Sequence, residues 1–203
     1  MLSPRSILKT ARKRGLSVIA LTDHGTIRGA REMVEDARSF DGLIAIPGVE
    51  VRTNIGDMIG LFIEQKIQAH DCFDVVDQIK KQDGLTVLAH PFRGHCNIPR
   101  QLIFDVDLIE TLNGRNSKTK NIEAQELASS HDKPALAGSD AHFSFEIGCV
   151  RTAFFDEVTT SEDLRRVIIR GERRLVGKQS SRFVHVFSFG VEVAKRMLGQ
   201  SEV

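Results

Sequence analysis

Residues of the types that bind metal ions recur along this chain, directly after short apolar runs. The run over residues 135–137 is followed by Gly138, where the backbone can turn, and then by Asp140 and His142. Packing explains such a pair poorly, because an aspartate beside a buried strand is rarely left without a partner. Both residue types are common ligands of divalent metals. Asp140 as the cap of a following helix is the alternative that this stretch leaves open.

Three earlier residues repeat this arrangement. Each follows an apolar run: His24 after 17–21, Glu50 after 43–49 and His90 after 85–89. If these runs are neighbouring parallel strands, their carboxyl ends share one rim, where barrel enzymes build their active sites. Five imidazole and carboxylate side chains would then gather there. Such a set, without thiolates, suits zinc, manganese or iron.

A site of this kind can hold more than one ion and act on phosphate esters. Two ions about 3.5–4 Å apart clamp an in-line displacement at phosphorus and lower the pKa of a bound water. Arg115, just past the run at 108–112, and Arg93 are candidate bidentate donors to a phosphate. Hydrolysis of a phosphoester is therefore the leading prediction, and hydrolysis of an amide is the chemical alternative.

The elements that must position these residues alternate between strands and helices. Strands are expected over 17–21, 43–49, 58–63, 85–89, 108–112, 135–137 and 151–155. Helices are expected between Ser3-Pro4 and Gly15, over 29–38, 71–82, 117–130 and 161–170, and at the end of 184–198. This alternation predicts an α/β fold with a parallel sheet, either open or closed into a barrel.

The composition excludes several classes of protein. With 28 basic and 27 acidic residues among 203, the net charge of +1 gives no bulk reason to bind nucleic acid or a membrane surface. No apolar run approaches the roughly 20 residues that a membrane span needs, and we see no signal peptide. The three cysteines are widely spaced and suggest no disulfide framework, so we expect a cytoplasmic protein.

Four segments together resemble the PHP (polymerase and histidinol phosphatase) superfamily of metal-dependent phosphoesterases. They are Leu21-Thr22-Asp23-His24-Gly25, Pro47-Gly48-Val49-Glu50-Val51, Ala89-His90-Pro91-Phe92 and Gly138-Ser139-Asp140-Ala141-His142. The resemblance covers nearly the whole chain and is to the small stand-alone members more than to the polymerase-attached ones. It implies a distorted TIM-like barrel of (β/α)7 type that carries two or three divalent metal ions.

The resemblance also implies a ligand for each ion. Glu50 would bridge two metals, with His90 on one and Asp140 on the other, while His24 and His142 would bind a third.

Three further residues are predicted to act in the site without binding metal. By resemblance, Asp23 would orient its neighbours, although capping the next helix is an equal alternative. The segment Ile109-Glu110-Thr111-Leu112-Asn113-Gly114-Arg115 is also similar to small members and places Glu110 and Arg115 near the pocket. An outward, solvated Glu110 and a surface salt bridge of Arg115 are the alternatives.

One family motif is absent. Asp-x-His-x-His on the first strand, and a histidine in the loop after it, have no counterpart here, because the chain opens on the helix at Ser3-Pro4. We therefore expect a single PHP domain over 1–203 that is incomplete at its N-terminus and lacks the first strand. A start codon assigned too far downstream and a truncation are favoured over a real short form with a damaged site. A homodimer covering the exposed sheet edges stays open.

The functional prediction follows from the site and the charge balance. We predict hydrolysis of a small phosphorylated metabolite or nucleotide, since nothing suggests a track for a long polyanion. A nuclease or proofreading-type PHP enzyme is the enzymatic alternative, so nucleic acid is not favoured as a partner but stays open. A metal-depleted, non-catalytic binding module is the alternative that is not an enzyme.

Overall fold

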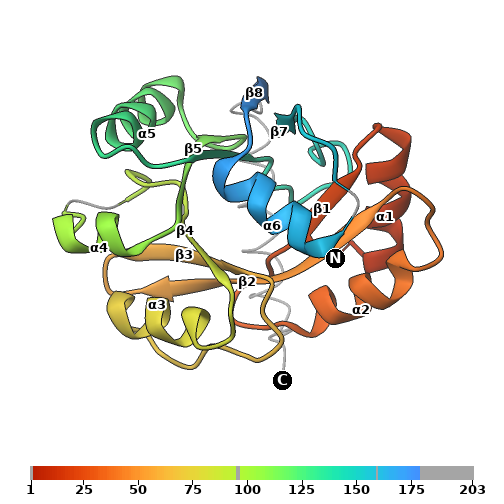
Figure 1. Ribbon diagram of the computed structural model, residues 1–203, viewed down its shortest axis with the longest axis horizontal. Coiled ribbons are helices and arrows are strands. Elements are labelled where there is room, and N and C mark those ends of the chain that lie inside the picture. The colour runs from red at the N-terminus through yellow and green to blue at the C-terminus, as the bar shows by residue number, and fades with distance from the viewer. Residues whose placement is uncertain (1, 95–96, 159, 179–203) are drawn as a thin grey trace, which may run out of the picture.

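A six-stranded sheet curled into half a barrel organises the protein (Figure 1). The computed structural model describes residues 2–94, 97–158 and 160–178. The strands follow the chain order across the sheet: β1 (Val18–Leu21), β2 (Ile44–Thr53), β3 (Gly56–Leu61), β4 (Leu85–Leu88), β5 (Leu108–Asn113) and β6 (Ala135–Gly138). A second, two-stranded sheet contains β7 (Val150–Phe154) and β8 (Arg173–Gly177).

The large sheet is mixed, so the prediction of a purely parallel sheet is wrong. β1 pairs parallel with β2, and β4, β5 and β6 pair parallel with one another, but β3 is antiparallel to both of its neighbours. Only residues 54–55 connect β2 to β3, which permits a hairpin but not the long crossover that parallel strands require. The described residues form a curled α/β sheet, and the closed (β/α)7 barrel stays a prediction.

Five of the six helices in the described residues lie within or close to the ranges that the sequence predicted. The six helices are α1 (Pro4–Lys13), α2 (Arg28–Ala37), α3 (Cys72–Lys80), α4 (Arg100–Asp105), α5 (Lys118–Ser130) and α6 (Ser161–Arg170). The side chains of Ser3, Asp71 and Ser117 accept hydrogen bonds from the first turns of α1, α3 and α5. The short helix α4 and strand β8 were not predicted from the sequence. The helix expected within 184–198 lies outside the described residues.

The core lies on both sides of the sheet. One cluster includes Val49, Met58, Leu88 and Ile109 from the strands together with α3 and α4, and α6 adds Leu164 to another with Leu85, Leu108 and Ile46. None of the helices in the described ranges is long and apolar enough to cross a membrane.

Candidate metal centre

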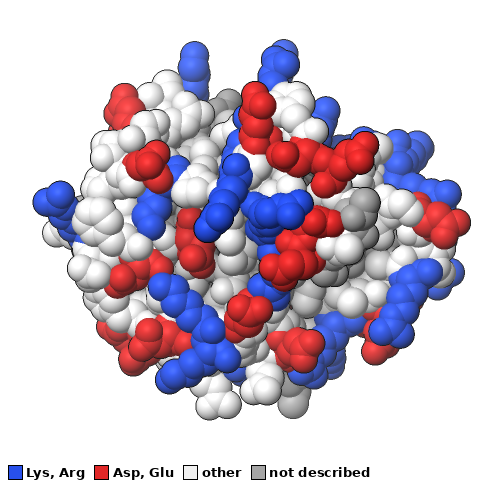
Figure 2. Space-filling view, viewed as in Figure 1, with Lys and Arg blue, Asp and Glu red and all other residues white. Residues whose placement is uncertain are grey.

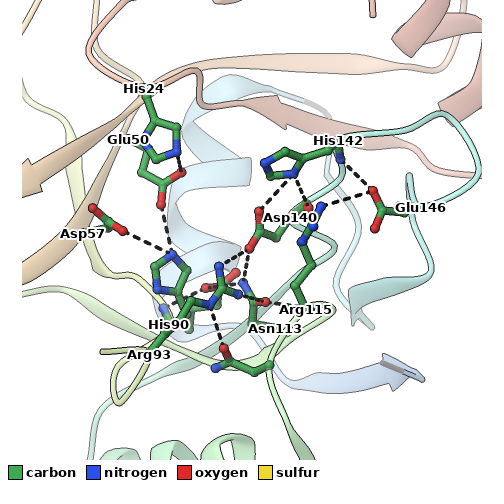
Figure 3. A network of polar contacts seen from close by, with 12 residues as sticks. His24, Glu50, Asp57, His90, Arg93, Asn113, Arg115, Asp140, His142 and Glu146 are labelled. Atoms are coloured by element: carbon green, nitrogen blue, oxygen red, sulfur yellow. Dashed lines mark hydrogen bonds and ion pairs between the residues drawn. The ribbon is translucent and has the colours of Figure 1, made fainter. Parts of the chain in front are cut away.

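The sequence-predicted ligands meet at one rim of the curled sheet (Figure 3). His90 follows the last residues of β4, Asp140 follows β6, and His24 lies beyond β1. Glu50 was expected just after a strand, but it lies inside β2. Pro47 forms the last parallel pair with β1, and from Gly48 the strand continues as the antiparallel partner of β3. An isolated bridge then aligns His24 with Glu50.

Four side chains, which we call the His90 cluster, point toward one another: His24, Glu50, Asp57 and His90 (Figure 3). The Nε2 atom of His90 lies 3.0 Å from Oε1 of Glu50 and 3.9 Å from Oδ2 of Asp57. The Nε2 atom of His24 lies 3.6 Å from Oε2 of Glu50. One ligand atom from each of His24, Glu50 and Asp57 falls within 4.8 Å of the others. This imidazole–carboxylate set fits a divalent zinc, manganese or iron ion.

Asp57 is the member of the His90 cluster that the sequence did not reveal. It lies near the start of β3, and because β3 is antiparallel, its first residues lie beside the end of β4. The backbone N–H of Ala89 donates to the carbonyl of Asp57 at 3.3 Å, which fixes this neighbourhood. The two-residue turn between two apolar runs was the signal that could have identified the hairpin.

The next part of the rim, the Asp140 cluster, contains Arg93, Asn113, Asn116 and Asp140. The Nη1 atom of Arg93 donates to Oδ2 of Asp140 at 2.6 Å, and Nε donates to Oδ1 of Asn116 at 2.9 Å. Nη2 of Arg93 donates to Oδ1 of Asn113. Burial would raise the pKa of Asp140, but the guanidinium beside it outweighs that effect and holds the pKa below its usual value. Asp140 is thus a carboxylate with a cationic partner.

Glu110 is buried next to His90. The alternative prediction, that its side chain points outward into solvent, is therefore wrong. Its Oε2 atom accepts the backbone N–H of His90 at 2.8 Å and Nδ2 of Asn113 at 3.0 Å. The pairing register between β5 and β6 shifts between Glu110 and Leu112, and such an irregularity re-aims the side chains that follow. Burial raises the pKa of Glu110 to about 7.

Gly138 has a different role from the turn that the sequence suggested. It is the last residue of β6, and a Cβ atom there would lie 2.1 Å from Oε1 of Glu110. The glycine therefore makes room for the buried carboxylate.

The backbone is left-handed at two candidate ligands. His90 has φ of 23° and Asp140 has φ of 49°, in a region that residues other than glycine adopt rarely and at a cost.

The charges around His90 change its pKa. Burial would lower the pKa of His90, but its hydrogen bond with Glu50 and the charge of Glu110 outweigh the effect of burial and raise that pKa. At His90, a strained backbone therefore occurs together with two carboxylates, Glu50 and Glu110, that stabilise the protonated imidazole.

A buried ion pair lies beneath the loop that carries His142. Arg115 and Glu146 approach within 3.6 Å, and their side chains are only 8% and 1% exposed. Oε2 of Glu146 accepts the backbone N–H groups of His142 and Phe143 at 2.8 and 3.0 Å. Residues 139–149 contain neither helix nor strand, so Asp140 does not cap a helix. Glu146 instead organises this loop, and the sequence gave no sign of it.

Asp23 and His142 complete the predicted set. The backbone oxygen of Asp23 accepts the N–H of Glu50 at 3.2 Å. The Asp23 carboxylate lies against the first turn of α2, where a Cβ on Gly29 would come within 2.5 Å of Oδ2. Nδ1 of His142 lies 3.6 Å from Oδ1 of Asp140, so His142 lies at the Asp140 side of the rim.

Comparisons with known proteins also indicate a relationship to PHP proteins. Residues 118–172 match a family model described as PHP-associated. The chain is 40% identical over 106 residues to an uncharacterized protein of Methanocaldococcus jannaschii, covering 52% of this chain and 61% of the relative. A second uncharacterized protein of that organism is 32% identical over 154 residues, covering 67% and 65%. The chain thus spans less than two thirds of these relatives' length.

A solved structure shares the fold. It is a two-domain protein from Bacteroides vulgatus containing a predicted PHP-like metal-dependent phosphoesterase, with a TM-score of 0.75 and 17% sequence identity. The match covers 88% of this chain and 61% of that one. The curled sheet and its imidazole–carboxylate rim therefore define a PHP-like α/β protein. The PHP-associated family model over residues 118–172 and the four motifs support the resemblance of this chain to the PHP superfamily.

Proposed function

We propose that this chain carries the site of a metal-dependent phosphoesterase that hydrolyses a small phosphorylated metabolite or nucleotide. The observation that carries the proposal is the convergence of two imidazoles and two carboxylates in the His90 cluster. The match to the PHP-associated family model and the PHP-like fold support the reaction class. On the face seen in Figure 2, basic and acidic side chains are interleaved, which favours a small substrate over a long polyanion.

The His90 cluster would hold the divalent ion. Three of the sequence-predicted ligands belong to it, and Asp57 joins them. Asp140 and His142, the other two, line the neighbouring part of the rim. When bound, the ion would lower the pKa of a coordinated water and polarise a phosphoryl oxygen.

The chain's own side chains would bind and orient the phosphoryl group. The Arg93 side chain is 33% exposed, and its guanidinium has five N–H donors, of which three are engaged. It is therefore better placed to contact a phosphate than Arg115, whose guanidinium is buried beside Glu146. Arg115 and Glu146 would position His142, and Glu110 would position His90.

Metal-dependent turnover tests this function. The chain, first freed of metal and then loaded with Zn²⁺ or Mn²⁺, is expected to hydrolyse an aryl phosphate or a nucleoside monophosphate, and Glu50→Gln is expected to abolish the activity. Asp83→Asn is a matched control, because the Asp83 side chain is 96% exposed and its ion pair is with the α6 residue Arg165, away from the His90 cluster. Cleavage of oligonucleotides alone would favour the nuclease, and metal binding without turnover would favour the binding module.

Three finer features are proposed with this function. They are a distorted TIM-like barrel of (β/α)7 type, a single domain over 1–203 and a homodimer that covers the sheet edges. Light scattering of the purified chain gives its mass directly, and a monomer would contradict the dimer.

A further inference from the structure

We infer that Arg93 serves as a built-in cation for Asp140, so that the chain holds a single divalent ion, in the His90 cluster. The inference rests on the proposed metal site and departs from the two or three ions that the family resemblance implies. It concerns only the number of ions and the residues that bind them.

The contacts of Arg93 resemble those of a bound ion. Three oxygen atoms from three different side chains converge on one guanidinium: Oδ2 of Asp140, Oδ1 of Asn113 and Oδ1 of Asn116. Each of the three guanidinium nitrogens donates to one of them. An arginine side chain stays protonated in proteins, so this positive charge is permanent.

The acceptors are fixed before any ligand arrives. Asn113 is fully buried, and its Nδ2 atom donates to Glu110 at 3.0 Å and to Asp140 at 3.3 Å. Its amide oxygen is therefore directed to Arg93 and to the backbone N–H of Arg115, 2.8 Å away. Asn116 is 5% exposed. The amide oxygens of Asn113 and Asn116 are therefore held in positions where both accept hydrogen bonds from one guanidinium.

A divalent ion at Oδ2 of Asp140 would have to displace this guanidinium, and an ion at Oδ1 would lie beside its positive charge. The Asp140 side chain is only 14% exposed, and a buried carboxylate is costly without a cationic partner. Arg93 meets that need at 2.6 Å, and like charges at the same carboxylate oxygen repel. In the described residues, the His90 cluster has no comparably buried arginine. Nε of Arg52 lies 3.5 Å from Oδ1 of Asp57, but the Arg52 side chain is 83% exposed to solvent. The ion is therefore expected there.

Metal stoichiometry tests the inference without reference to turnover. The full chain is stripped of metal, dialysed against Zn²⁺ and analysed by elemental mass spectrometry. We expect one tightly held equivalent in the wild type and two in Arg93→Gln, with the second lost in Arg93→Gln/Asp140→Asn. Arg93→Lys, which keeps a cation, should stay at one equivalent. Arg166→Gln should also stay at one, as a control whose side chain on α6 is 64% exposed.

The change in Tm on adding Zn²⁺ is a second measurement, which also applies to a variant that is less stable than the wild type. Zn²⁺ should raise the Tm of Arg93→Gln more than that of the wild type, because the ion replaces the lost charge. A wild type with two equivalents, one of them removed by Asp140→Asn, would overturn the inference and leave the proposed function standing. Failure of Arg93→Gln to gain an equivalent would also overturn it. One equivalent without turnover would instead overturn only the proposed function.

Discussion

The carboxylate of Glu110 accepts the backbone N–H of His90 at 2.8 Å, joining the end of β4 to the middle of β5. His90 has a positive φ angle, and this hydrogen bond helps to hold it there. Replacing Glu110 by alanine would leave the His90 amide without this acceptor and would remove one of the two acceptors of Nδ2 of Asn113. We expect Glu110→Ala to lower the free energy of unfolding by roughly 1–3 kcal/mol, measured by urea denaturation. An unchanged stability would contradict this role.

The raised pKa of Glu110 predicts how the stability of the metal-free chain depends on pH. Burial raises that pKa from 4.5 to about 7, so the folded state holds the proton more tightly than the unfolded state. The stabilising contribution of protonated Glu110 is therefore present in full below pH 4.5. It is lost as the pH rises to about 7. The raised pKa of His90 acts in the same direction. Denaturation at several pH values should show this loss, and Glu110→Gln should reduce it; an equal loss in both proteins would refute the assignment.

Gly138 is expected to be sensitive to the smallest side chain. In Gly138→Ala, the new Cβ would meet Oε1 of Glu110 at 2.1 Å, so the buried carboxylate must move and its hydrogen bonds must weaken. Thermal unfolding should show a lower Tm. In a Glu110→Ala background the same change should cost much less, because the obstructing carboxylate is gone. Additive effects of the two substitutions would rule out the contact as the cause.

Parts of this site were predictable from the sequence because they depend on local patterns. The apolar runs ending before His24 and His90, and the Gly-Ser-Asp-Ala-His stretch, place ligand-type residues at strand ends. Ser3-Pro4 likewise marked the start of α1, where the Ser3 side chain caps the first turn.

Other parts depend on pairing between distant segments. Asp57 reaches the rim only because β3 runs antiparallel. Arg93 and Asp140 meet across 47 positions of sequence, and Glu146 pairs with Arg115 beneath a loop without regular structure. No periodicity or turn signal in one sequence reports the Arg93–Asp140 or Arg115–Glu146 contact, so the division of the rim into two clusters became visible only in the structure.

Glu146 is predicted to control the loop that carries His142. Glu146→Ala removes the acceptor of two backbone N–H groups and leaves the buried Arg115 without this partner, so the loop should open more often. Hydrogen exchange of the His142 and Phe143 amides should become faster by at least an order of magnitude, in keeping with the roughly 1–3 kcal/mol that such an acceptor contributes. Exchange in α3, which packs against β3 and β4, serves as the internal control. Equal acceleration there would indicate general destabilisation instead.

Asp57 is predicted to contribute to metal binding although no sequence motif marks it. Asp57→Asn should weaken Zn²⁺ binding on the order of 10- to 100-fold in a calorimetric titration, because a charged ligand becomes neutral. Asp83→Asn changes an exposed carboxylate in the same way and should leave the affinity unchanged. Equal affinities for the wild type and Asp57→Asn would exclude Asp57 from the site.

Anomalous X-ray diffraction from crystals soaked in Zn²⁺ tests the account most directly, because it locates the ion without relying on activity. We predict one strong peak within coordination distance of Glu50, Asp57 and His90, while the guanidinium of Arg93 stays on Asp140. A strong peak at Asp140 with Arg93 displaced would contradict the single-ion inference. No ordered peak at the His90 cluster would contradict the metal centre itself.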